Sequence, residues 1–168
     1  TLQLLFINLI NDSLPAIALA FEVAEPNTMN KPPRDINEGI LQGGTSSVIL
    51  IRGIIISIVV IIAQYLGNKT SPILGAAMAF STITLSRIFQ TLPARSDNIS
   101  VFNIGVAKNK YVLGAICICL LLYLIVLLPG LRAIFSIPNY FGVMEFAICI
   151  LLALISTVLM ELVKIFKK

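Results

Sequence analysis

The stretch Leu2-Gln-Leu-Leu-Phe-Ile-Asn8-Leu-Ile-Asn11-Asp12-Ser-Leu-Pro15-Ala-Ile-Ala-Leu-Ala-Phe-Glu22 is apolar enough to cross a bilayer, but its middle contains two asparagines, an aspartate and a proline. These four residues follow the spacing i, i+3, i+4, i+7, which places them on one face of a regular α-helix. We therefore expect Asn8, Asn11 and Asp12 to converge on one point in the interior of a helix bundle. Polar groups at that depth usually mark a functional site.

Pro15 adds a backbone feature to this face. It has no N–H, so a carbonyl about one turn earlier loses its helical donor, and the helix can kink or open there. Carboxylate, amide and carbonyl oxygens are the ligands that calcium prefers, and they also suit manganese. The stretch predicts a cation site with Asn8, Asn11 and Asp12 as ligands and Pro15 as the residue that opens the helix.

The composition sets the class of protein. Hydrophobic residues make up 58% of the 168-residue chain, charged residues make up 12%, and the mean hydropathy is +0.98, which excludes an ordinary soluble domain. At about 20 residues per crossing, the chain is predicted to be an all-α membrane protein, one domain over residues 1–168. We expect five spans, at residues 2–22, 46–66, 72–92, 111–128 and 141–163.

Basic residues predict the orientation of these spans. Two of them, Lys69 and Arg132, fall on one side, and Arg87 lies inside the third span. The other nine fall on the opposite side: Lys31, Arg34, Arg52, Arg95, Lys108, Lys110, Lys164, Lys167 and Lys168. The positive-inside rule then predicts a cytoplasmic C-terminus. Thr1 would lie outside, and because it is not an initiator methionine we expect the chain to begin within a longer protein.

The rest of the sequence shows no pattern for catalysis or nucleic-acid binding, and the cysteines are interpreted as structural. The three cysteines lie in apolar runs without metal-ligand spacing, and the chain contains no histidine. No nucleophile–base pair or phosphate-binding loop is visible, and the basic residues form no patch interleaved with aromatics that would suit a nucleic acid.

Several stretches resemble calcium-transporting P-type ATPases. The segments Asn8-Leu-Ile-Asn-Asp-Ser-Leu-Pro-Ala-Ile-Ala-Leu19 and Pro26-Asn-Thr-Met-Asn-Lys-Pro-Pro-Arg34 closely resemble the family's sixth transmembrane helix and the cytoplasmic loop after it. Phe102-Asn-Ile-Gly-Val-Ala-Lys-Asn-Lys110 resembles the loop before the ninth helix, and Glu161-Leu-Val-Lys164 resembles the end of the tenth. The resemblance covers nearly the whole chain and implies helices six to ten of a ten-helix transport domain.

The resemblance carries roles to particular residues. It implies that Asn8, Asn11 and Asp12 are ion ligands of the calcium branch, since sodium/potassium pumps have an Asp in place of Asn8. Asn11 stands where many reticulum-type pumps have a Thr. The loop containing Pro32, Pro33 and Arg34 is expected to couple the helices to the phosphorylation domain; the alternative is a solvated turn stiffened by Pro-Pro.

Calcium takes about six to eight oxygens, more than this helix offers, and the family supplies the others from upstream helices. The phosphorylated Asp and the nucleotide-binding domain are also upstream in the family. ATP and magnesium would therefore act only through absent domains, and we expect no catalysis by this chain alone. Its expected partners are those upstream helices and cytoplasmic domains together with the lipid bilayer.

Arg87 departs from the family pattern. Aligning Met78-Ala-Phe-Ser81 with the eighth helix of reticulum-type pumps places Arg87 where they have a Glu that ligates one of two ions. A guanidinium cannot ligate calcium. The hypothesis is that Arg87 substitutes for the second ion, pairing with Asp12 or an upstream carboxylate; the alternative is that it snorkels to the nearby interface.

The sequence thus predicts the membrane portion of an ATP-driven calcium pump, expected in a bacterial plasma membrane, with a reticulum membrane as the alternative. One competing interpretation is a stand-alone channel or secondary transporter, in which repeats between spans are expected, and none is visible. Another is a non-catalytic membrane scaffold, which would not need the polar cluster of the first span.

Overall fold

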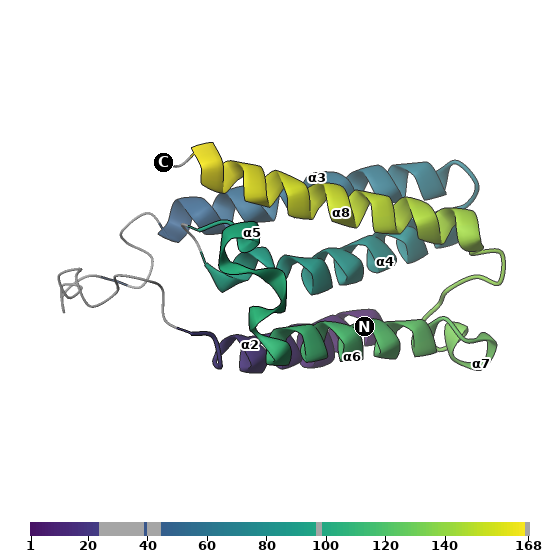
Figure 1. Cartoon of the computed structure of the whole chain (residues 1–168). Helices are drawn as coiled ribbons and strands as arrows, with labels where there is room; N and C mark the ends of the chain where they lie inside the picture. The colour runs from purple at the N-terminus through teal and green to yellow at the C-terminus, as the bar shows by residue number, and fades with distance from the viewer. Residues whose placement is uncertain (24–38, 40–44, 97–98, 167–168) are drawn as a thin grey trace, which may run out of the picture.

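The computed structural model describes residues 1–23, 39, 45–96 and 99–166 (Figure 1). Within these ranges the chain is built from helices, with no strand, which confirms the predicted all-α class. The elements are α1 (Leu2–Phe6), the π-helix η1 (Ile7–Asn11), α2 (Ser13–Leu19), α3 (Thr45–Asn68), α4 (Pro72–Gln90), the 3-10 helix η3 (Pro93–Arg95), α5 (Val101–Ile104), the 3-10 helix η4 (Val106–Lys108), α6 (Lys110–Val126), α7 (Pro129–Arg132) and α8 (Val143–Phe166).

Four stretches of the described chain are long and apolar enough to cross a membrane. They are Leu2–Leu19, Thr45–Asn68, Pro72–Gln90 and Val143–Lys164. The fifth apolar helix, α6, has 17 residues and ends at Val126. It stops there because Pro129 begins the next helical turn and holds Leu128 in an extended conformation. The protein is an all-α membrane bundle, with one span shorter than the others.

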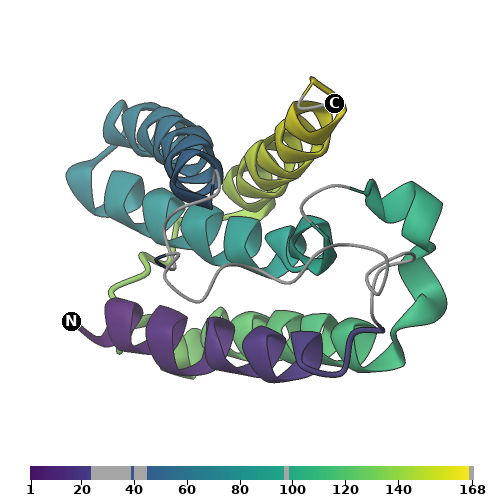
Figure 2. The same ribbon diagram turned by 90° about the vertical axis from the view of Figure 1, so that its left-hand side faces the viewer.

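The helices form two groups joined by α4. In Figure 1, α3, α4 and α8 pack together, and the N-terminal helix (α1, η1 and α2) packs along α6. Figure 2, turned by 90°, shows the same two groups. Helix α4 also contacts α6 and η1, and 61% of its span is buried, against 28% for α8 and 11% for α3. Therefore α4 is the central helix on which the other spans are placed.

Aromatic rings fix the N-terminal helix against α4. The Phe6 and Phe80 rings meet edge to face with centroids 6.2 Å apart, and Phe135 stacks on Phe80 at 6.1 Å. Tyr123 of α6 also meets Phe80 edge to face, with centroids 6.1 Å apart. Such ring pairs add about 0.5–1.5 kcal/mol each beyond their area burial. This cluster joins α1, α4 and α6 one to two turns before Asn11 and Asp12.

Helices α3 and α4 form a close antiparallel hairpin. A Cβ atom on Gly67 would lie 2.6 Å from Cα of Gly75, so the backbones touch where both residues are glycine. Ser71 caps α4 by accepting a hydrogen bond from the backbone N–H of Leu74 at 3.1 Å. The hairpin thereby sets the register of α4, which carries Arg87.

The connections gather at two ends of the bundle (Figure 1). Residues 69–71 and 127–142 lie at one end, and residues 91–96 and 99–109 lie at the other with the end of α8. There Glu161 accepts hydrogen bonds from the Ser100 hydroxyl and the Val101 N–H, and it pairs with Lys164 at 2.8 Å. The charge pattern of the sequence predicts that this second end is cytoplasmic.

Candidate functional site

The N-terminal span changes its helical geometry at the polar face. The backbone N–H of Asp12 donates to the carbonyl of Ile7 at 3.0 Å, an i→i−5 bond that closes the π-turn η1. Pro15 follows and has no N–H to donate to the carbonyl of Asn11. Such π-turns frequently occur at functional sites. The irregular backbone therefore lies about one turn before Pro15, the residue at which the sequence predicts that the helix opens.

Asn11 presents a buried oxygen at this turn. Its side chain is 1% exposed, and Nδ2 donates to the backbone carbonyl of Thr84 at 3.0 Å. Its Oδ1 atom has no hydrogen-bond partner within the described part of the chain. Leaving a buried acceptor unpaired costs about 1–3 kcal/mol. Because Nδ2 fixes the amide, the orientation of Oδ1 is fixed as well.

Asp12 faces Arg87 of the neighbouring helix α4. Nη1 of Arg87 lies 3.3 Å from Oδ1 and 3.4 Å from Oδ2 of Asp12. One nitrogen serves both oxygens, so this is not the fork-to-fork pair in which two nitrogens bind two oxygens. The side chains are 43% and 38% exposed on the surface of this chain. The carboxylate therefore keeps lone pairs that a cation could use.

Asn11, Asp12 and Pro15 line one cavity of about 330 Å³. Arg87 lines it from α4, and Gln90, one turn later on the same helix, joins it. Arg52 lines it from α3 and Met160 from α8, so the N-terminal helix, α3, α4 and α8 all contribute. The sequence could point to Gln90, because it lies three residues after Arg87 on the same helix. Arg52 was interpreted from the sequence only as an indicator of membrane orientation, since the contact of α3 with this cavity depends on tertiary packing.

The expected convergence of Asn8 with Asn11 and Asp12 is not seen. Asn8 is exposed and does not line the cavity. It lies in η1, where a turn contains more residues than in an α-helix, so the i, i+3 spacing no longer places Asn8 and Asn11 on one face. The interpretation of Asn8 as an ion ligand stays a prediction that rests on the resemblance.

The predicted coupling-loop residues Pro32, Pro33 and Arg34 fall outside the described residues. Within the described ranges, no three His, Cys, Asp or Glu side chains lie close enough together to hold a metal ion. Asn11 and Asp12 can offer about three side-chain oxygens, fewer than the six to eight that calcium takes.

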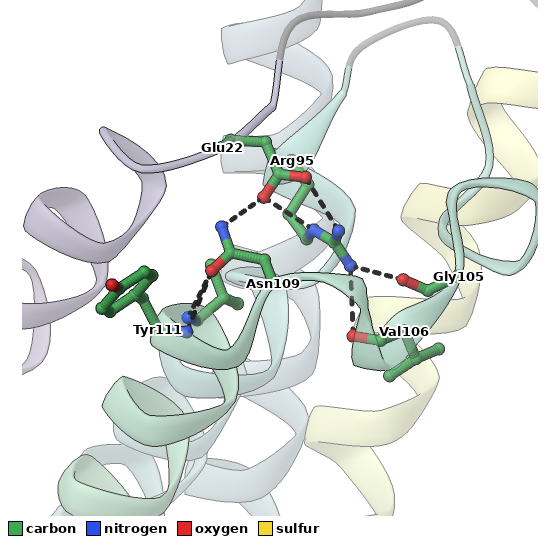
Figure 3. Close-up of polar contacts among 7 residues, drawn as sticks. Glu22, Arg95, Gly105, Val106, Asn109 and Tyr111 are labelled. Atoms are coloured by element: carbon green, nitrogen blue, oxygen red, sulfur yellow. Dashed lines mark hydrogen bonds and ion pairs between the residues drawn. The ribbon is translucent and has the colours of Figure 1, made fainter.

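A second polar cluster lies where α2 and α4 end, and the sequence did not single it out (Figure 3). Arg95 binds both carboxylate oxygens of Glu22, with Nε to Oε2 at 2.9 Å and Nη2 to Oε1 at 2.8 Å. Asn109 donates to Oε2 at 2.7 Å. The Arg95 hydrogen bonds hold the pKa of Glu22 below its ordinary value. No local spacing could reveal this cluster, because its members are 73 or more residues apart from Glu22.

Known proteins match the whole of this bundle. The family described as "Cation transporting ATPase, C-terminus" matches residues 1–166. A calcium-transporting ATPase of Listeria monocytogenes is 54% identical over 164 residues, which cover 98% of this chain and 19% of that protein. Calcium-transporting ATPase 1 of Lactococcus lactis is 53% identical over 166 residues, covering 99% of this chain and 19% of that protein.

More distant matches extend to animals. Calcium-transporting ATPase type 2C member 1 of Bos taurus is 32% identical over 142 residues, covering 80% of this chain and 14% of that protein. The chain thus spans about a fifth of the length of its bacterial relatives. With a family match over residues 1–166, the chain belongs to the C-terminal membrane region of the cation-transporting ATPases.

Proposed function

We propose that the chain is the C-terminal membrane part of an ATP-driven calcium pump, in which Asn11 and Asp12 bind the transported ion. The observation that carries the proposal is the buried Oδ1 of Asn11, which has no hydrogen-bond partner among the described residues and lies at a π-turn next to Asp12. Its bacterial relatives at more than half identity are named as calcium-transporting ATPases. Asn8 adds a third ligand if it turns toward upstream helices, which complete the calcium shell.

Arg87 gives the site room for one divalent ion. Its guanidinium lies 3.3 Å from Asp12 and lines the same cavity. Two unit charges about 4 Å apart repel by about 4 kcal/mol at an effective dielectric constant of 20. Any calcium ion next to Arg87 would meet at least that repulsion, and the Asp12 carboxylate can offset it for one ion but not for two. We infer that Arg87 takes the place of a second ion, so that one calcium ion moves per cycle.

Energy for transport would come from the upstream domains. ATP and magnesium act there, and phosphorylation of an upstream Asp switches the membrane site between two orientations. The loop with Pro32, Pro33 and Arg34 couples the two parts. The end of the bundle that holds Glu22, Arg95 and Lys164 faces the cytoplasm, since most basic residues lie there. The membrane is a bacterial plasma membrane, in line with the bacterial relatives.

The test is Asp12→Asn in the full-length pump, because this change nearly preserves the size of the side chain and removes its charge. Calcium-dependent phosphorylation from ATP should vanish, and phosphorylation from inorganic phosphate should survive. Ser13→Ala is the matched control, since Ser13 is the exposed neighbour and its hydroxyl donates to the Asn8 backbone carbonyl at 3.4 Å. Calcium-dependent phosphorylation of Asp12→Asn at micromolar calcium would remove Asp12 from the site.

A further inference from the structure

A polar cluster that we call the clamp joins three helix ends and consists of Glu22, Arg95 and Asn109 (Figure 3). Glu22 follows α2, Arg95 follows α4, and Asn109 precedes α6. The Glu22 carboxylate accepts three charge-assisted or amide hydrogen bonds of 2.7–2.9 Å. The Arg95 side chain is 0% exposed and that of Glu22 is 16% exposed. Buried fork pairs of this kind fix geometry strongly.

Arg95 also fixes the turn before α6. Its remaining nitrogen, Nη1, donates to the carbonyls of Gly105 at 3.0 Å and Val106 at 3.2 Å. Gly105 has a φ of +91°, which side-chain-bearing residues rarely adopt. All the nitrogens of the guanidinium therefore have partners, and those partners come from two different connections.

Asn109 performs two tasks with separate atoms. Its Oδ1 accepts hydrogen bonds from the N–H groups of Tyr111 at 3.0 Å and Val112 at 3.2 Å, and so it caps α6. Its Nδ2 donates to Glu22. An aspartate could serve as the cap but has no N–H for Glu22. The amide thus ties the start of α6 to the end of α2.

Two ion pairs connect the same two helices. Asp12 lies at the start of α2 and pairs with Arg87 of α4, and Glu22 and Arg95 follow these helices and pair with each other. The second pair is buried and bidentate, whereas the first is more exposed and uses one nitrogen. At 1.5 Å per helical residue, the pairs are roughly 12–15 Å apart along the helices. A sliding of α2 along α4 would have to break the stronger pair.

We propose that the clamp sets the register of α2 on α4 and thereby the position of Asp12 relative to Arg87. Glu22, Arg95 and Asn109 are then positioning residues for calcium binding, although none of them touches the ion. Helices α2 and α6 move as one unit, because Asn109 joins them and the Phe21 and Tyr111 rings contact each other beside the joint, with centroids 4.8 Å apart and planes tilted by 30°. This inference rests on the proposed function of the site.

The test is Asn109→Asp in the full-length pump, because this variant keeps the cap of α6 and places a carboxylate against Glu22. The calcium concentration for half-maximal phosphorylation from ATP should rise about fivefold or more. The maximal level of phosphorylation from inorganic phosphate should stay unchanged. Glu22→Gln, which keeps the shape of the side chain and removes its charge, should shift the calcium dependence in the same direction. It provides the measurement if Asn109→Asp fails to insert.

A double-mutant cycle separates register from general stability. If the clamp acts by placing Arg87 against Asp12, the Asn109→Asp shift should shrink to less than about half in an Arg87→Gln background. Glu145→Gln is the control, since Glu145 accepts a hydrogen bond from Gly142 at the other end of the bundle from the clamp. An unshifted calcium dependence in both clamp variants, or an equal shift in both backgrounds, would overturn the proposal. An unmodified pump without calcium-dependent phosphorylation would instead overturn the proposed function.

Discussion

Arg87 and Asp12 are 75 residues apart in the sequence, and Nη1 of Arg87 lies 3.3 Å from Oδ1 of Asp12. The pair brings a fixed positive charge to the carboxylate that is expected to bind a cation. Both side chains line the same cavity, so the charge acts on whatever enters it. The net charge that this pair presents to an ion is close to zero, and this is the basis of the proposal that the cavity holds one divalent ion.

We predict a stoichiometry of one calcium ion per phosphorylatable enzyme in the full-length pump. The physical reason is the repulsion between Arg87 and any second divalent ion at this distance. The measurement is the amount of radioactive calcium bound at saturation, divided by the maximal amount of phosphoenzyme. A ratio of two in the unmodified pump would show that Arg87 does not take the place of an ion.

A second prediction concerns the buried oxygen of Asn11. Asn11→Leu keeps an uncharged side chain of similar size and removes both Oδ1 and the hydrogen bond to the Thr84 carbonyl. Calcium affinity should fall about tenfold or more, because the shell loses a fixed oxygen. The lost hydrogen bond should lower stability by about 1 kcal/mol.

The control for that loss of stability is the variant Asn11→Asp. It restores an oxygen ligand but cannot donate to Thr84, so it should recover calcium binding better than Asn11→Leu while remaining less stable than the unmodified pump. Calcium dependence of phosphorylation measures the first effect, and thermal unfolding in detergent measures the second. Equal calcium affinity in Asn11→Leu and the unmodified pump would exclude Oδ1 as a ligand.

The fold class could be predicted from the sequence because bilayer thickness and hydropathy determine the number and approximate length of spans. The predicted span 111–128 is observed as a helix from Lys110 to Val126, since Pro129 imposes an extended residue before it. Which spans touch could not be predicted from periodicity. The central place of α4 depends on contacts such as Gly67 against Gly75, and only the packed chain reveals them.

The candidate site was predicted in part. Asp12 and Asn11 could be found because carboxylates and amides are costly within a membrane span. The turn that separates Asn8 from them could not be found, because a regular helical spacing assumes one hydrogen-bond pattern throughout. The sequence did not single out Glu22 and Arg95, because a charged side chain is ordinary at a membrane interface. Their significance comes from a contact between residues 73 positions apart.

The third prediction concerns pH. The Arg95 hydrogen bonds lower the pKa of Glu22 from its ordinary value of 4.5, with burial opposing and Asn109 assisting. A lowered folded-state pKa means that the stabilisation is fully present above about pH 4.5 and is lost as the pH falls through the lowered value. Glu22→Gln should therefore reduce stability by about 2 kcal/mol at neutral pH and by progressively less in acid.

Thermal unfolding of the unmodified protein and of Glu22→Gln between pH 3 and pH 7, values chosen to span roughly the carboxylate range, measures this effect. The two curves should converge at the acid end. Glu145→Gln controls for the loss of a carboxylate elsewhere, at the cap of α8. A difference between Glu22→Gln and the unmodified protein that stays constant over the whole range would show that the charge of Glu22 does not stabilise the clamp.

The last prediction concerns the isolated chain. It should insert into a membrane but neither hydrolyse ATP nor bind calcium at micromolar concentration, because Asn11 and Asp12 offer about three of the six to eight oxygens required.

The same isolated chain tests the predicted topology. The two ends of the helix bundle should face opposite compartments. Cysteines replacing Thr70 and Asn103, which are both exposed, should react with a membrane-impermeant reagent from opposite sides. The native Cys117, Cys119 and Cys149 are replaced by serine or alanine as background. Labelling of both positions from one side would overturn the topology, and micromolar calcium binding by the isolated chain would revive the interpretation as a stand-alone channel or transporter.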